Sequence, residues 1–225
     1  ISGEIEYAVE HIISNKFDTD LSNVYLNRNG LFEKGNNKSE LIALDKIPFV
    51  TEFYMKKLDI KKYFYSAAQY PVVTIIASRG CPFKCSFCNI PSNYNKGYRR
   101  RSASNLISEF EFVKNNLKNV KEIFIEDDSF NADLNFLKEF CRLKITKKNK
   151  IPYSINFYPD KYDEETFYLL KKSNCRLLVI GYESGNEKNL ELVKPNCSIK
   201  KYFKLNRLIK KFKFKVHGCF IIGLP

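Results

Sequence analysis

From about Tyr70 onward, short β-rich runs alternate with amphipathic helical stretches, and this alternation constrains the fold more than any other feature. Five runs rich in Val, Ile and Phe are expected to be strands, at 72–77, 122–127, 153–158, 176–184 and 215–223. Helices are expected at 104–117, around Leu134, Leu137 and Cys141, and at 164–172, 187–193 and 199–212. Strands that alternate with helices predict repeated βα units around a parallel sheet.

The expected strands show little polar alternation, which is typical of a parallel sheet covered on both faces. No glycine-rich phosphate loop follows the first strand, so a barrel is favoured over a doubly wound sheet. We therefore expect an α/β fold in residues 66–225, a partial (β/α) barrel of parallel strands with outer helices and about five of six βα units.

Residues 1–65 differ in character and are expected to form a small α+β linker segment. EIEYAVEHII predicts a helix, VYLNRNGLFEKG a hairpin turned at Asn29-Gly30, and ALDKIPF an extended linker ended by Pro48. The chain begins without Met and stops just after an apolar run, so we expect both ends to be cut from a longer protein.

Three cysteines, Cys81, Cys85 and Cys88, follow the first expected strand with C-x₃-C-x₂-C spacing. The loops after the strands of such barrels carry the chemistry. A structural zinc site needs four protein ligands in a pairwise arrangement, and no other Cys or His has companion spacing. Thiolates also bind iron–sulfur clusters, and a four-iron cluster held by three cysteines leaves one iron open. Phe87 could shield one edge of such a cluster or stack on a ring.

The remaining four cysteines, Cys141, Cys175, Cys197 and Cys219, stand alone in apolar or helical surroundings and are expected to be buried thiols.

The stretch RGCPFKCSFC (79–88) resembles the signature of radical S-adenosylmethionine enzymes, in which an aromatic residue commonly precedes the last cysteine. The resemblance covers residues 70–225. It implies a [4Fe-4S] cluster held by Cys81, Cys85 and Cys88, with S-adenosyl-L-methionine chelating the fourth iron. It also implies reductive cleavage of that cofactor to a 5′-deoxyadenosyl radical, with an electron donor such as flavodoxin or ferredoxin.

The resemblance also implies cofactor-binding residues beyond the cysteines. FIEDDSF places Glu126, Asp127 and Asp128 after the second strand, where the family binds the methionyl amine; a helix cap is the alternative role. GYESG resembles the family's G-x-E-S-G and makes Glu183, with Ser184, a candidate for the ribose hydroxyls or the methionyl end. CFIIGLP resembles the fifth strand, so Gly223 is expected near the adenosine. No residue is assigned to receive the substrate radical.

Weaker likenesses point to the subclass linked to a cobalamin-binding domain. SGEIEYAVEHI resembles the G-E-x-E segment that leaves that domain, and LIALDKIPF resembles the linker that follows it. No D-x-H-x-x-G motif is present, so cobalamin is implied only for a domain outside this chain. The implied function is methylation, cyclisation or rearrangement of a small-molecule, lipid or peptide substrate.

Two alternatives stay open. A tRNA methylthiotransferase-like enzyme is suggested by CNIPSNYNKGYRRRS, although residues 1–80 lack the second cysteine trio of that group. A non-catalytic iron–sulfur or nucleic-acid-binding protein is the other, although a structural cluster would normally be fully ligated by protein.

A formal charge of +13 is compatible with nucleic-acid binding, but most lysines are spread along the chain and are expected on solvated helix faces. Only Gly97–Ser102, with Arg99, Arg100 and Arg101, forms a compact basic patch, so RNA stays open as a partner without being indicated. No run approaches the roughly 20 apolar residues of a membrane span, and no export signal opens the sequence. A cytoplasmic protein without a membrane span is expected.

Overall fold

The computed structural model describes residues 1, 3–15, 19–37, 40–90, 97–194 and 196–224. The N-terminal elements are α1 (Glu6–Ser14), β1 (Tyr25–Arg28), β2 (Leu31–Lys34) and α2 (Val50–Lys57). The rest are β3 (Val72–Ile75), β4 (Ser78–Arg79), β5 (Arg99–Arg100), α4 (Ala103–Asn116), β6 (Glu122–Ile125), α5 (Leu134–Thr146), β7 (Tyr153–Phe157), α6 (Glu164–Lys172), β8 (Cys175–Glu183), α7 (Glu187–Val193), α8 (Ile199–Phe212) and β9 (Lys215–Phe220).

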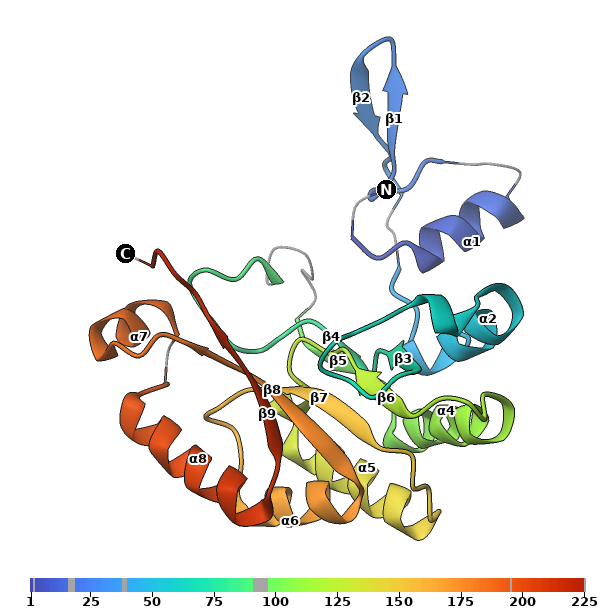
Figure 1. The fold of residues 1–225 in the computed structure, drawn as a ribbon. Helices are drawn as coiled ribbons and strands as arrows, with labels where there is room; N and C mark the ends of the chain where they lie inside the picture. The colour runs from blue at the N-terminus through green and yellow to red at the C-terminus, as the bar shows by residue number, and fades with distance from the viewer. Residues whose placement is uncertain (2, 16–18, 38–39, 91–96, 195, 225) are drawn as a thin grey trace.

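The main sheet has five parallel strands in the order β3-β6-β7-β8-β9, which is also their order along the chain. Neighbouring strands in space are thus neighbours in sequence, as in the wall of a (β/α) barrel. The sheet confirms the expected α/β partial barrel (Figure 1). Because the strands are parallel, their carboxyl ends meet at one edge, where the loops that follow them gather.

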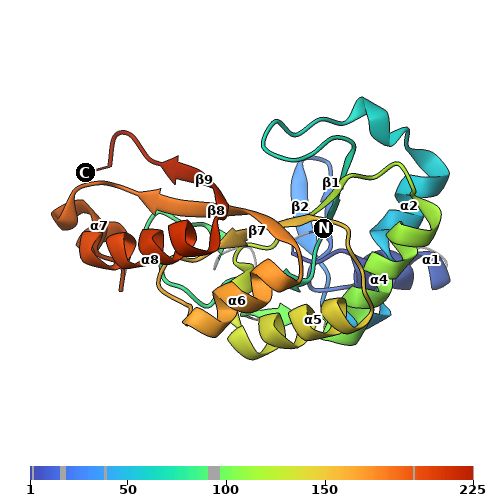
Figure 2. The ribbon, with the colours of Figure 1, turned by 60° about the horizontal axis from the view of Figure 1, so that its bottom comes forward.

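Helices α4, α5, α6 and α8 cover one face of the sheet in both ribbon views (Figures 1 and 2). The main core lies between these layers and contains Phe110 and Phe140 from the helices and Ile123 and Tyr153 from the strands, all fully buried. Each of the last five helices begins at a polar cap whose side chain accepts a hydrogen bond from a backbone amide of the first turn: Ser102, Asp133, Asp163, Asn186 and Ser198.

The N-terminal segment has a small core of its own, built from Ala8, Leu21 and Val24. The expected helix and hairpin are present, and β1 and β2 pair antiparallel on either side of Asn29-Gly30. The domain boundary near residue 65 stays a prediction.

The linker expectation was wrong in one respect, because a 3₁₀ turn spans Leu44–Lys46. Helix α2, which follows the linker, was not predicted. Helix α2 buries only Thr51, so its apolar residues carry no clear helical pattern. The first strand ends at Ile75, and the short strand β4 after it pairs antiparallel with β5. This two-residue ribbon, which the sequence did not predict, closes the ends of the cysteine loop onto each other.

Candidate functional site

The three predicted cysteines line one cavity of about 250 Å³ at the carboxyl ends of the parallel strands. Cys81, Cys85 and Cys88 are all half-buried. The rest of the lining comes from Phe87, Ile90, Asp128, Asn156, Phe157, Tyr158, Val179, Gly181, Glu183, Lys194 and Cys219. The structure thus brings the cysteines together with Phe87, Asp128 and Glu183, three of the other seven predicted site residues.

Packing and backbone bonds hold the cysteine loop against the barrel. The ring of Phe83 stacks on Tyr158, with centroids 3.5 Å apart and planes inclined by 7°. The Ser86 amide donates to the carbonyl of Val193 at 3.0 Å, which fixes the loop to the end of α7. Phe87 is 44% exposed, so Phe83 rather than Phe87 anchors the loop.

Burial disfavours the charged form of the cysteines. It raises the pKa of the Cys81 thiol, and it raises the pKa of the Cys85 thiol to about 11. The positive charge of Lys194 lowers the pKa of both thiols and so acts against the effect of burial. At Cys85 it is the largest influence that lowers the pKa. Metal binding at these thiols therefore releases protons.

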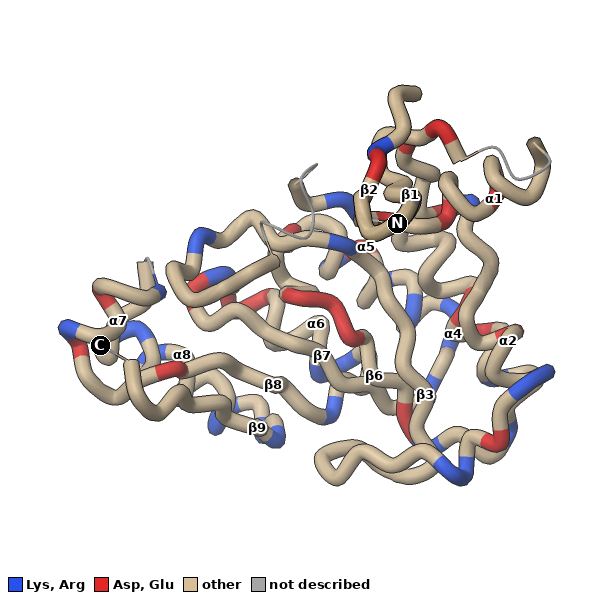
Figure 3. Tube along the Cα trace, turned by 90° about the horizontal axis from the view of Figure 1, so that it is seen from above, with Lys and Arg blue, Asp and Glu red and all other residues tan. Residues whose placement is uncertain are grey.

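The three acidic side chains that follow β6 lie in three different surroundings. Figure 3 shows this stretch as a run of acidic residues at the carboxyl end of β6. Asp128 lines the cysteine cavity, where burial raises the pKa of its carboxyl. Asp127 is 1% exposed and is turned toward Ala77 and Ser78, whose amides donate to it. Glu126 is exposed and lines a different cavity, of about 370 Å³, shared with Tyr54.

Glu183 is held in a rare backbone conformation at the end of β8. Its φ is +60°, and a bulge interrupts the pairing of β8 with β9 just before it. Its carboxylate accepts a hydrogen bond from the Lys194 ammonium at 2.9 Å, and Lys194 also donates to the Gly181 carbonyl. A Cβ on Gly181 would lie 2.1 Å from Glu183 Oε1, so only glycine leaves room for this pair.

Like Glu126 and Asp127, the predicted residues Ser184 and Gly223 lie outside the cavity lining. The Ser184 hydroxyl accepts a hydrogen bond from the Asn186 amide at 3.1 Å, next to the start of α7. Gly223 has a φ of +91° in the turn after β9, and no atom lies within 4 Å of a Cβ built on it.

The lining residues that sequence reasoning missed include Asn156, Tyr158 and Lys194. Asn156 donates to the Asp127 carbonyl at 2.8 Å, and a polar amide near the carboxyl end of a largely apolar strand was a usable signal. Lys194 carried no signal in a chain with 38 lysines and arginines.

Three of the four remaining cysteines are buried as expected, namely Cys141, Cys175 and Cys197. The expectation was wrong for Cys219, which is exposed and lines the cysteine cavity. Its strand β9 is the last in the sheet, and all six of its residues are exposed.

The predicted basic patch is engaged by carboxylates. Arg99 pairs with Glu4, Arg100 pairs with Asp133 at 2.9 Å, and Arg101 pairs with Glu109 at 2.5 Å. These arginines tie β5 to the N-terminal segment and to two helices, so they do not form a free basic surface. Residues 91–96 of the stretch that resembles methylthiotransferases lie outside the described residues.

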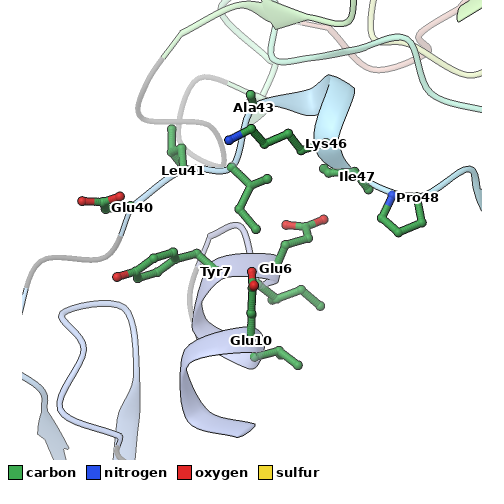
Figure 4. A pocket seen from close by; sticks show the side chains of 12 residues that line it. Glu6, Tyr7, Glu10, Glu40, Leu41, Ala43, Lys46, Ile47 and Pro48 are labelled. Atoms are coloured by element: carbon green, nitrogen blue, oxygen red, sulfur yellow. The ribbon is translucent and has the colours of Figure 1, made fainter. Parts of the chain in front are cut away.

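A third cavity, of about 790 Å³, lies between α1 and residues 40–48. Figure 4 shows Glu6, Tyr7 and Glu10 of α1 facing Leu41 and the segment that follows it. None of the predicted site residues lines this cavity, and Glu6 is already paired with Arg79 at 2.5 Å.

Among the described residues, no three His, Cys, Asp or Glu side chains are arranged to hold a single metal ion. A multi-iron cluster places a different iron at each cysteine and does not require the sulfurs to converge on one point. The cysteines share one cavity, so they fit a cluster.

The profile of the Radical SAM superfamily matches residues 75–225, more than half of the chain. This chain belongs to the Radical SAM superfamily. The expectation drawn from the cysteine signature is therefore confirmed, and with it the expectation of an enzyme family that uses a [4Fe-4S] cluster and S-adenosylmethionine.

Similar proteins include methyltransferases of this superfamily. Bacteriochlorophyllide d C-12(1)-methyltransferase of Chlorobaculum tepidum is 28% identical over 229 residues, covering 99% of this chain and 46% of that protein. Cytidylyl-2-hydroxyethylphosphonate methyltransferase of Streptomyces wedmorensis is 28% identical over 195 residues, covering 81% of this chain and 35% of that protein. The chain thus spans between a third and a half of these relatives.

The fold also matches a solved structure. The radical S-adenosylmethionine methyltransferase TsrM from Kitasatospora setae, with tryptophan substrate and an S-adenosylmethionine analogue bound, superimposes with a TM-score of 0.76. The match covers 100% of this chain and 46% of that chain, at 16% sequence identity, and shows a shared fold. Within the described residues, no helix is long and apolar enough to span a membrane.

Proposed function

We propose that this chain is the S-adenosylmethionine-cleaving core of a cobalamin-linked radical methyltransferase. The observation that carries the proposal is the cavity of about 250 Å³ in which three cysteines meet Asp128 and Glu183 at the carboxyl edge of the barrel. The methyltransferase activity of the two relatives supports the choice of reaction within the superfamily.

The residues of the cavity divide into cluster ligands and groups that bind S-adenosylmethionine. Cys81, Cys85 and Cys88 hold the [4Fe-4S] cluster, which supplies the electron that cleaves the sulfonium bond of S-adenosylmethionine. Asp128 and Glu183 are the carboxylates that line the same cavity, and a carboxylate accepts hydrogen bonds from an ammonium or from ribose hydroxyls.

The other predicted residues have supporting roles in this proposal. Asp127 holds the start of the cysteine loop through Ser78, and Ser184 holds the turn between Glu183 and α7. Phe87 covers one side of the cavity. Glu126 lines the neighbouring cavity with Thr74 and Ile76 and not the cavity of the cysteines. Gly223 leaves the end of β9 open to the adenosine.

A small molecule is the substrate class we propose, and an electron donor such as flavodoxin or ferredoxin is the expected partner. The named substrates of the two relatives differ from each other, so similarity to them selects no single substrate. We propose that the full-length protein also binds cobalamin, which absorbance spectra of the purified protein would reveal.

The test is electron paramagnetic resonance of the full-length protein after anaerobic cluster reconstitution and reduction, with and without S-adenosylmethionine. We expect a four-iron signal that changes when S-adenosylmethionine is added, because one iron has no protein ligand. Glu183→Ala should weaken that response while the cluster signal persists. A four-iron signal that is indifferent to S-adenosylmethionine, or the absence of a cluster, would overturn the proposal.

A further inference from the structure

Lys194 places a buried positive charge in the wall of the cysteine cavity. Its side chain is 4% exposed, and its ammonium donates to Glu183 Oε1 at 2.9 Å and to the Gly181 carbonyl. The same ammonium lies 5.1 Å from the ring centroid of Tyr158. These contacts fix the position of the charge, and water screens a buried charge weakly.

The charge is connected to the cysteine loop by short contacts. Tyr158, beneath the ammonium, stacks on Phe83 between Cys81 and Cys85. Val193, the residue before Lys194, accepts the amide of Ser86, the residue after Cys85. Lys194 lines the same cavity as Cys81, Cys85 and Cys88.

Reduction adds one negative charge to an iron–sulfur cluster. A fixed positive charge nearby stabilises the reduced form, and a fixed negative charge stabilises the oxidised form, most strongly where little water is present. The cavity is lined by one positive group, Lys194, and by two carboxylates, Asp128 and Glu183, of which Glu183 is in direct contact with Lys194.

We infer that the Lys194–Glu183 pair sets the reduction potential of the cluster, with Lys194 raising it and Glu183 lowering it. The inference rests on the proposed function, since it requires a cluster on Cys81, Cys85 and Cys88. Lys194 is thus a positioning residue that also holds the carboxylate of Glu183 in the cavity. Gly181 permits the contact because it has no Cβ.

The experiment is a potentiometric titration of the reconstituted full-length protein without S-adenosylmethionine, followed by electron paramagnetic resonance. Lys194→Met should lower the reduced-to-oxidised ratio at a fixed applied potential about tenfold, which equals a shift of about 59 mV for a one-electron couple. Glu183→Gln should raise that ratio by a similar factor, and the double variant should lie between the two. Lys194→Arg, which keeps the charge, should stay close to the unmodified protein.

Arg176→Met is the matched control. Arg176 forms a similar partly buried ion pair, to Glu122 at 2.7 Å, but it lies at the opposite end of β8 from Glu183. The two positions are seven residues apart along the strand, which corresponds to about 23 Å. Arg176→Met should destabilise the fold without changing the reduction potential of the cluster. The comparison therefore separates an electrostatic effect of Lys194 from a loss of stability.

The outcomes separate this inference from the proposed function. If the unmodified protein holds no cluster, the proposed function fails. If every variant holds a cluster but Lys194→Met and Glu183→Gln leave the potential unchanged or shift it in the same direction, only the inference is overturned. If Lys194→Met loses its cluster, the inference is tested with Glu183→Gln and Lys194→Arg instead. An unchanged reduction potential in Glu183→Gln would then contradict it.

Discussion

The carboxylate of Asp127 is bonded to Ser78 at two points. Oδ1 accepts the Ser78 amide at 2.9 Å, and Oδ2 accepts the Ser78 hydroxyl at 2.6 Å. The bonds join the carboxyl end of β6 to β4, three residues before Cys81. An acidic side chain that resembles a ligand for the cofactor therefore serves to hold the backbone from which the cysteine loop starts.

The burial of Asp127 predicts an unusual pH dependence of stability. Burial raises the pKa of this carboxyl to about 6, against the hydrogen bonds from Ser78 and Ala77. Between its ordinary pKa of 3.8 and about 6, the folded protein binds more protons at this site than the unfolded chain. The Asp127 contribution to the free energy of unfolding therefore falls as pH rises from about 4 to about 6, by on the order of 3 kcal/mol, and is constant above.

Asp127→Asn cannot titrate and should lack this fall, while its amide still accepts from the backbone. Urea unfolding of both proteins between pH 4 and pH 7 measures the difference. Identical pH profiles would contradict the raised pKa.

The cysteines divide into cluster ligands and buried thiols, and single substitutions separate the groups. Cys81→Ala, Cys85→Ala and Cys88→Ala should each abolish cluster formation, because each removes one of three protein ligands. Cys141→Ala and Cys175→Ala should keep the iron content of the unmodified protein, since both residues are buried away from the cavity. Iron and sulfide analysis after reconstitution checks this, and loss of iron in the second group would break the assignment.

The fold was largely predictable because its strands repeat one pattern. Strands β3, β6, β7 and β8 bury apolar side chains in the main core, and such runs are recognisable in a single sequence. Helix α2 was not predicted because it buries a single residue, Thr51. The ribbon of β4 and β5 has two residues in each strand, too few to show a period.

The site residues could be predicted where the chemistry of the side chain alone determines the role. They could not be predicted where the direction in which the side chain points determines it. The three cysteines follow from their spacing. Asp127 and Asp128 are adjacent in sequence but face different surroundings, one toward Ser78 and the other into the cavity. Lys194 meets Glu183 only through the bulge in β8 and a positive φ at Glu183, and neither is encoded in a pattern that one sequence reveals.

The close approach at Gly181 predicts a sharp difference between two glycines of one motif. Gly181→Ala would place a Cβ 2.1 Å from Glu183 Oε1 and should push the carboxylate away from Lys194, at a cost of about 1–3 kcal/mol. Gly185→Ala meets no atom within 4 Å and should leave stability nearly unchanged. Urea unfolding and titration with S-adenosylmethionine compare the two variants, and equal behaviour would contradict the close approach.

The two phenylalanines of the cysteine loop should behave differently. Phe83→Ala removes the ring stacked on Tyr158 and should release the loop, because stacked pairs contribute about 0.5–1.5 kcal/mol beyond the area they bury. We expect a lower unfolding temperature and faster loss of iron. Phe87→Ala should leave the unfolding temperature nearly unchanged, since Phe87 is 44% exposed. A larger loss of stability in Phe87→Ala than in Phe83→Ala would contradict this order.

The same substitution can be compared at a buried ion pair, that of Arg101, and at a partly exposed one, that of Arg100. Arg101 is paired with Glu109, whose side chain is fully buried and also accepts the Thr51 hydroxyl at 2.9 Å. Arg101→Met leaves that carboxylate without its cation and should lower the free energy of unfolding by about 3–5 kcal/mol. Arg100→Met should cost less than about 1 kcal/mol, because its pair with Asp133 is partly solvated.

Chemical denaturation of the two variants measures the difference. Arg101→Met combined with Glu109→Gln should recover part of the loss, because the second change removes the buried unpaired charge. If Arg101 belonged to a free nucleic-acid-binding surface instead, both arginine variants would keep the stability of the unmodified protein and lose affinity for RNA.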